Sequence, residues 1–121
     1  MFFKFPKDDQ RFSWTNHIKN KMLFYGLSEQ KIRSVLNAPK RKEEGIAPQT
    51  VAVMKRNDRG KKKEEIWVMY LRRPDINVGG RSPDRERRGR LLMISAWRYP
   101  GISKPGTEIP IPNDIRKELG L

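Results

Sequence analysis

Six cationic and aromatic residues of this sequence have types and positions that could together support a reaction. They are His17, Lys21, Arg41, Trp97, Arg98 and Tyr99. The reaction they fit is attack of a ribose 2′-hydroxyl on its own phosphate, which needs a proton acceptor, a proton donor and stabilisation of a phosphorane-like anion. Histidine transfers protons near neutral pH, cations stabilise the developing charge, and an aromatic ring can hold an unstacked base. Such chemistry requires neither a metal nor a cysteine.

Each of these residues also has a purely structural interpretation. His17, the only histidine, and Lys21 lie toward one edge of a predicted apolar helix face. A histidine there more often packs and hydrogen bonds than catalyses, and a lysine can lay its aliphatic stem along the surface. Trp97 fits the packing of a sheet better than a platform for a base. Arg98 and Tyr99 are stronger candidates, because strand ends and the loops after them commonly carry sites.

Other kinds of catalytic site find little support. The chain has no cysteine, which removes thiol nucleophiles and Cys-type zinc sites, and a single histidine excludes a multi-histidine metal site. The acidic residues lie beside basic ones in runs such as "KRKEEG" and "KKKEE", which are typical of solvated ion pairs. Neither "GLSEQK" nor "NVGGRS" continues as a phosphate-binding loop, and no Ser–His–Asp set can be assembled. We therefore expect no metal and no cofactor.

Net charge is the strongest overall signal. The chain of 121 residues carries 27 Lys and Arg against 14 Asp and Glu, a formal net charge of +13. A field of this size most often serves a polyanionic partner. The other interpretations are an acidic protein partner, a membrane surface, or charge that only aids solubility. The membrane is the weakest, because no long basic amphipathic helix with an aromatic face is visible and no apolar run approaches the ~20 residues of a bilayer span.

Length and composition also bound the location and organisation of the chain. The length predicts a single domain over 1–121. The start "MFFKFPKDDQ" has too short an apolar stretch for a secretory signal. The lack of cysteine suits a reducing compartment. We expect a soluble, cytoplasmic protein with no membrane partner.

Two connections concentrate the positive charge. Segment 55–63 has six basic residues and one acidic residue, and segment 72–90 has seven arginines and three acidic residues. The two prolines and three glycines of 72–90 predict a flexible basic loop. Both segments form an electrostatic footprint for a nucleic-acid backbone. The candidate nucleic-acid-binding residues are Arg41, Arg59, Lys61, Lys62, Lys63, Arg81, Arg85, Arg87, Arg88 and Arg90.

The residues around His17 predict two helices within about 16–37. Their apolar faces are Ile18, Met22 and Tyr25 in the first helix, and Ile32, Val35 and Leu36 in the second. Thr15 or Asn16 can cap the first helix and Gly26 can end it. Ser28 can cap the second, which ends before Pro39.

Strand patterns follow this helical hairpin. Segments 50–55, 64–73 and 91–99 predict strands, and 41–47 predicts a further edge strand. Segments 64–73 and 91–99 are apolar on both faces, as expected of central strands. "FFKF" is a short strand or a strap over the core, and "PNDIRKELGL" predicts a short helix capped by Asn113 or Asp114. The predicted fold class is α+β, with the hairpin packed on a three- to four-stranded antiparallel sheet and a short C-terminal helix.

Two segments resemble a known family. "WTNHIKNKMLFYGLSEQKIRSVLNAPKR" (14–41) and "LLMISAWRY" (91–99) are similar to the BrnT-like toxins of the RelE/ParE toxin superfamily. They also resemble a related, poorly characterised bacterial domain family that opens with His–x3–(Arg/Lys)–Met. In those relatives a helix leads through Gly–(Val/Ile/Leu)–Ser to a second helix with an Asn/Asp–x–Pro stop, and a late strand ends in Ile–Ser–Ala followed closely by Arg. The order and spacing agree over roughly a third of this chain.

The resemblance implies a small α+β ribonuclease-type fold, RNA cleavage without a metal, and neutralisation by a cognate antitoxin. By position, His17 and Lys21 match the first helix, and Ser95 and Arg98 match the late strand motif. Arg98 is the better candidate for a phosphate contact. This chain departs from the pattern in its two basic connections, and in "AWRYPG" where the relatives tend to show "AR" followed by further basic residues.

We therefore expect a metal-independent endoribonuclease of the toxin type. Lys21 and Arg98 would stabilise the scissile phosphate, and His17 or Tyr99 would assist proton transfer. RNA and a cognate antitoxin are the expected partners. A non-catalytic RNA-binding module on the same fold and a basic protein-interaction domain are the alternatives, and the sequence leaves the oligomeric state open.

Overall fold

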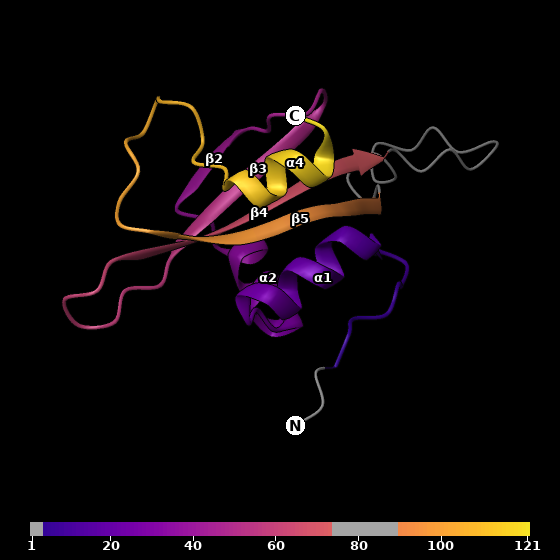
Figure 1. The fold of residues 1–121 in the computed structure, drawn as a ribbon. Helices are drawn as coiled ribbons and strands as arrows, with labels where there is room; N and C mark the ends of the chain where they lie inside the picture. The colour runs from indigo at the N-terminus through magenta and orange to yellow at the C-terminus, as the bar shows by residue number, and fades with distance from the viewer. Residues whose placement is uncertain (1–3, 74–89) are drawn as a thin grey trace.

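Three helices and a five-stranded sheet make up the described residues, 4–73 and 90–121, of a computed structural model. In chain order the elements are β1 (Phe12–Trp14), α1 (Asn16–Tyr25), α2 (Glu29–Asn37), β2 (Arg41–Glu44), β3 (Thr50–Arg56), β4 (Glu64–Arg73), β5 (Arg90–Pro100) and α4 (Asn113–Leu119). The strand order is β1-β5-β4-β3-β2 (Figure 1). None of the three helices is both long enough and apolar enough to cross a membrane.

The sheet confirms the α+β class but differs from the expected antiparallel sheet of three or four strands. That prediction is wrong, because β1 pairs in parallel with β5 and makes the sheet mixed. Phe12 lies opposite Leu91, and Trp14 opposite Met93. Three residues are too few to show an alternating pattern, so β1 depends on a partner distant in sequence. The edge strand β2 is also shorter than the predicted 41–47.

Local capping chemistry sets the ends of α1 and α2 within the predicted range of 16–37. The Thr15 hydroxyl accepts a hydrogen bond from the backbone N–H of Ile18, so Thr15 rather than Asn16 is the N-cap of α1. Gly26 ends α1 with φ +67°, a left-handed conformation that suits glycine. Ser28 caps α2 through its hydroxyl. These predictions are confirmed.

The N-terminus of α4 differs from its prediction. Its N-cap is Pro112, which makes no side-chain cap hydrogen bond, so the predicted cap at Asn113 or Asp114 is wrong. The Asp114 carboxylate instead contacts Lys21 and Tyr25 of α1. A long-range ion pair has replaced the local hydrogen bond that the sequence pattern suggested.

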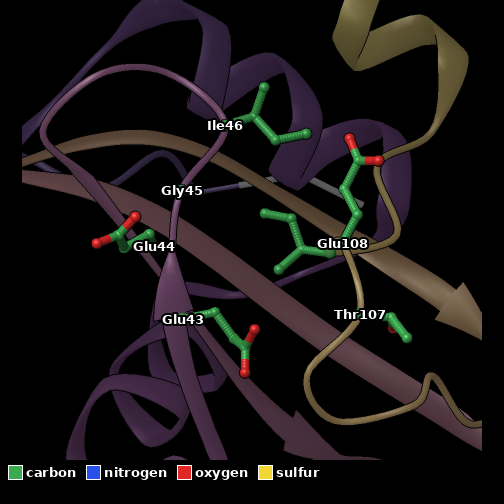
Figure 2. Close-up of a pocket in the computed structure, with 7 residues that line it drawn as sticks. Glu43, Glu44, Gly45, Ile46, Thr107 and Glu108 are labelled. Carbon is green, nitrogen blue, oxygen red and sulfur yellow. The ribbon is translucent and has the colours of Figure 1, made fainter.

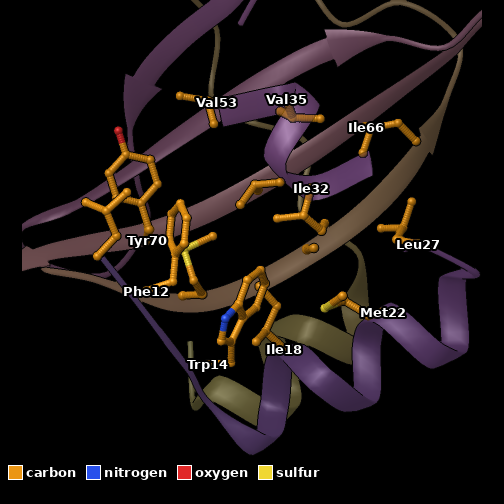
Figure 3. Packing of buried hydrophobic residues seen from close by; sticks show 14 residues of the cluster. Phe12, Trp14, Ile18, Met22, Leu27, Ile32, Val35, Val53, Ile66 and Tyr70 are labelled. Carbon is orange, nitrogen blue, oxygen red and sulfur yellow. The ribbon is translucent and has the colours of Figure 1, made fainter. Parts of the chain in front are cut away.

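Helices cover both faces of the sheet. Helices α1 and α2 lie on one face and α4 lies on the other (Figure 1). The first face buries a cluster that includes Phe12, Ile18 and Ile32 (Figure 3). The second contains Trp67 and Trp97, whose rings stack 6.1 Å apart. Burial of Trp97 confirms its prediction as a packing residue.

Helix α1 lies beside β5 where β1 leaves that strand unpaired. Strand β1 pairs only with Leu91–Met93. Just beyond, the Thr15 hydroxyl is 2.8 Å from the carbonyl oxygen of Met93 and 3.1 Å from that of Ile94, which anchors the start of α1. Tyr25, at the other end of α1, packs against the clusters on both faces. One side of α1 therefore faces α4.

The first basic connection is a β-hairpin between β3 and β4. Arg59 and Lys62 exchange two backbone hydrogen bonds of 2.9 Å, and Gly60 between them has φ +59°, which favours glycine. The second, the flexible loop predicted at 72–90, lies outside the described residues except for its ends in β4 and β5.

Candidate functional site

Two of the predicted site residues lie where α1 meets α4. Lys21 Nζ is 2.9 Å from Asp114 Oδ2 and 2.5 Å from Glu118 Oε2, and only 7% of its side chain is exposed. The Tyr25 hydroxyl donates to Asp114 at 3.1 Å. His17 Nδ1 is 3.8 Å from Glu118. We call these five residues the α1–α4 polar cluster.

Helical spacing explains this cluster. His17, Lys21 and Tyr25 recur every four residues on α1, and Asp114 and Glu118 are four apart on α4. Residues at i and i+4 lie on one face of a helix, so the two faces meet as opposite charges. The charge of Lys21 is thus matched by two carboxylates rather than left open for a phosphate.

Burial and hydrogen bonding fix the protonation of the cluster. Burial alone would lower the pKa of Lys21, but its hydrogen bonds to Asp114 and Glu118 outweigh burial and raise it. Burial would likewise raise the pKa of Asp114, and its bonds from Lys21 and Tyr25 lower it instead. Burial, with the bond to Asp114, raises the pKa of Tyr25 well above its ordinary value. Lys21 therefore stays charged and Tyr25 protonated at neutral pH, so neither serves as a base there.

His17 lies between a serine and an acid. Its Nε2 is 2.9 Å from Ser95 Oγ, and Glu118 lies on the side of Nδ1. This order is that of a Ser–His–acid triad, but Ser95 is fully buried and cannot reach a substrate. The distance of 3.8 Å between His17 Nδ1 and Glu118 Oε2 is also too long for a hydrogen bond. The hydrogen bond between His17 and Ser95 instead connects α1 to β5.

Acid should destabilise the fold through His17. Burial lowers the pKa of His17 below its ordinary value of 6.5, although Glu118 opposes this. The unfolded chain therefore binds a proton before the folded protein does, and stability is lost as pH falls from 6.5 through the folded pKa. We expect His17→Gln to remove this part of the pH dependence, measured by urea unfolding at pH 7.5 and pH 5.0. An equal loss of stability in wild type and variant would contradict the assignment.

Arg98 is held by backbone and carboxylate together. Its Nε donates to the carbonyl oxygen of Tyr25 at 2.6 Å, and its NH2 group to that of Gly26 at 3.1 Å. Its NH1 group is 2.8 Å from Glu64. A cation at the C-terminus of a helix satisfies the last carbonyl groups and the helix dipole. Arg98 thus fastens the end of α1 to β4 and β5.

Tyr99 and Arg98 line a pocket at the end of β5, which we call the β5-end pocket. Its volume is about 310 Å³, and its lining is Tyr25, Arg98, Tyr99, Pro100, Pro110, Ile111 and Pro112. Three separate segments therefore build it: the end of α1, the end of β5 and the residues before α4. The structure brings Arg98 and Tyr99 together in this lining, whereas Lys21 and His17 face α4 and are not part of it.

Arg41 belongs to neither the α1–α4 polar cluster nor the lining of the β5-end pocket. Its NH1 group is 2.6 Å from Ser103 Oγ, and its guanidinium packs over the Trp67 ring at 5.1 Å. Only 9% of its side chain is exposed, beside Glu43. It packs the segment after β5 against the sheet and presents little charge to solvent.

A buried carboxylate network lies next to Arg41, and the sequence pattern missed it. Glu65 is 0% exposed. It accepts hydrogen bonds from Trp67 Nε1, from the backbone N–H and hydroxyl of Ser103, and from Arg56. The prediction that "KKKEE" is solvated surface is wrong for this residue. The alternation of side chains along β4 could have revealed its burial, because Glu65 lies on the same face of the strand as Trp67 and Met69.

Most of the other predicted basic residues that the structure describes are exposed. Arg59, Lys61, Lys62 and Lys63 lie on the β3–β4 hairpin, and Arg90 begins β5. Lys63 is 3.8 Å from Asp58. The remaining predicted residues, Arg81, Arg85, Arg87 and Arg88, lie outside the described residues.

Three further lysines, not singled out in the sequence, adjoin this hairpin. Lys31 Nζ donates to Asn57 Oδ1 at 3.1 Å, and Lys55 Nζ to Ser34 Oγ at 2.7 Å. Lys40 is brought next to Lys55 by its backbone bond to Met54. We define the hairpin surface as Lys31, Lys40, Lys55, Arg59, Lys61 and Lys62. Within the described residues, no carboxylate forms an ion pair with any of these six.

Comparisons with known proteins do not assign a family. No family model, curated protein or solved structure matches this chain. The similarity to BrnT-like toxins therefore stays a prediction.

A second pocket, unlike the β5-end pocket, is lined by negatively charged residues. It holds about 480 Å³ between the end of β2 and residues 107–109, and its lining includes Glu43, Glu44 and Glu108 (Figure 2). Glu43 is near Arg41, and Glu108 pairs with Arg116. No group of acidic or histidine side chains in the described ranges is arranged to hold a metal ion. Because these carboxylates repel phosphate, a nucleic acid is expected on other surfaces.

Proposed function

We propose that this chain binds single-stranded RNA through the hairpin surface and does not cleave it. The observation that carries the proposal is a set of six cations without a carboxylate partner in the described structure. They lie on α2, on β3, on the hairpin that follows β3 and, for Lys40, just before β2. Like charges held close together are unfavourable, and a phosphate backbone would relieve their repulsion. The net charge of +13 supports the same partner.

Binding fits the geometry better than cleavage does. The predicted phosphate ligand Lys21 is paired with Asp114 and Glu118. The guanidinium of Arg98 already contacts two carbonyl groups and one carboxylate. With these two cations engaged, Lys21 and Arg98 offer little stabilisation for a phosphorane-like anion. In the hairpin surface, Lys31 and Lys55 hydrogen bond only to the neutral side chains of Asn57 and Ser34, so their charges are not neutralised.

Binding is expected to depend steeply on salt. The logarithm of the binding constant falls linearly with the logarithm of the salt concentration, and each phosphate neutralised on a single strand contributes about −0.7 to the slope. Six contacts predict a slope of about −4. The variant Arg59→Gln/Lys61→Gln/Lys62→Gln is expected to reduce this slope by about 2. Fluorescence anisotropy with a 12-nucleotide RNA between 50 and 200 mM salt measures both slopes.

A matched triple variant separates local contacts from net charge. Lys7→Gln/Lys104→Gln/Lys117→Gln removes the same charge from exposed positions outside the hairpin surface. We expect the salt slope of this variant to differ from that of wild type by less than about 0.5. Equal reductions of the salt slope in the two triple variants would contradict a localised site.

Cleavage is tested by incubating the RNA with the protein in the presence of a chelator. Fragments that form with wild type and not with His17→Gln would favour an endoribonuclease instead. An antitoxin partner stays a prediction from the resemblance.

A further inference from the structure

The β5-end pocket has the size and the walls of a site for one flat ring. Its volume of about 310 Å³ lies at the small end of ligand pockets, which span ~300–1,000 Å³. Two tyrosines, Tyr25 and Tyr99, and three prolines supply most of its lining, and Arg98 is its only charged residue. Aromatic faces stack on nucleobases with little regard to sequence, since every base has a π-face.

The pocket is joined to the hairpin surface by a chain of hydrogen bonds. Arg98 in the pocket lining contacts Glu64 Oε2 at 2.8 Å, and Asn57 Nδ2 contacts the same oxygen at 2.7 Å. Asn57 Oδ1 in turn accepts from Lys31 of the hairpin surface at 3.1 Å. The two features therefore lie next to each other, so a strand bound along the lysines would pass beside the pocket.

An exposed aromatic residue adjoins the pocket lining. Phe24, next to Tyr25 on α1, is 70% exposed. The Phe24 ring stands edge-on to the Tyr25 ring, with centroids 4.9 Å apart. The Tyr25 hydroxyl is fixed by Asp114, so this aromatic wall is held in place before any ligand arrives. Fixed rings lose little conformational entropy on binding.

We propose that the β5-end pocket holds one unstacked base of the RNA strand that lies on the hairpin surface. The inference rests on the proposed function, since it places the base of a strand whose backbone the lysines bind. Tyr99 stacks on the base and Tyr25 closes the other side. A duplex keeps its bases stacked and paired, so the pocket selects single strands.

Two probes of equal charge test the pocket: a 10-nucleotide RNA with all its bases, and an abasic ribose-phosphate strand of the same length. For wild type we expect the base-containing strand to bind roughly 5- to 100-fold more tightly. Tyr99→Ala should remove most of this preference and leave the salt slope unchanged. Tyr99→Phe, the matched control, should retain it. Thermal unfolding of each variant reports its folding, and Tyr99→Leu replaces the alanine variant if that variant does not fold.

The outcomes separate the two proposals. Equal, salt-dependent binding of both strands to wild type would overturn the pocket and leave the hairpin surface standing. A preference for bases that survives in Tyr99→Ala and Tyr99→Leu would assign base recognition to another part of the surface, and would also overturn the pocket. Binding of neither strand at low salt would overturn the proposed function, and the pocket with it.

Discussion

Replacing Glu65 by alanine is expected to lower the free energy of unfolding by about 3 to 5 kcal/mol. The carboxylate is fully buried and accepts from Trp67, Ser103 and Arg56. Its removal leaves the buried donors of Trp67 and Ser103 without an acceptor, at a cost of about 1 to 3 kcal/mol for each. Arg56 loses its buried partner but keeps Asp58 and the carbonyl oxygen of Gly101. Urea unfolding of wild type and variant measures the difference.

A matched variant distinguishes the lost hydrogen bonds from lost packing. Glu65→Gln keeps the shape and one acceptor oxygen, but its amide group faces donors where a carboxylate oxygen stood. We expect it to be destabilised less than Glu65→Ala and still by more than about 1 kcal/mol. If both variants unfold within about 0.5 kcal/mol of wild type, the network does not hold the segment around Ser103 to the sheet.

Arg98→Ala is expected to lower the free energy of unfolding by about 2 to 3 kcal/mol, because three hydrogen bonds of a charged group are lost together. The side chain is 24% exposed, which limits the effect. Two of the bonds satisfy the last carbonyl groups of α1 and the third reaches Glu64. Chemical denaturation at neutral pH measures the loss.

Arg98→Lys tests whether the fork of the guanidinium matters. Lysine keeps the charge but cannot reach two carbonyl groups and a carboxylate at once, so it should restore less than half of the lost stability. A phosphate ligand would behave differently. If Arg98→Ala leaves stability unchanged while RNA is bound more weakly and Arg98→Lys restores binding, Arg98 contacts the nucleic acid directly.

The parts of the fold that local chemistry decides could be predicted from the sequence. Thr15, Gly26 and Ser28 cap or end their helices through contacts within a few residues. The apolar strands 64–73 and 91–99 were also predictable, since their length and β-rich composition already mark central strands. Strand β1 was not predictable, because three residues are too few to show an alternation of apolar and polar side chains. Its pairing partner, β5, also lies far away in the sequence.

The candidate site was less predictable for the same reason. Helical spacing correctly places His17 and Lys21 on one face. The partner of Lys21 is Asp114, 93 residues away, and an aspartate at the start of a helix is equally consistent with a cap. Only the packing of α1 beside β5 brings the two helices together. Charge patterns along a sequence show where cations are, but not which of them an acid has already neutralised.

The position of α1 has a consequence for how the chain folds. Helix α1 is synthesised before β5 and α4, yet Thr15 anchors it to β5 and Lys21 to α4. Its apolar residues, Ile18 and Met22, belong to a cluster that is completed only when Leu91, Met93 and Ala96 of β5 emerge. Contacts so distant in sequence slow folding, and exposed apolar surface favours aggregation meanwhile. The completion of this cluster therefore depends on one of the last strands to be synthesised.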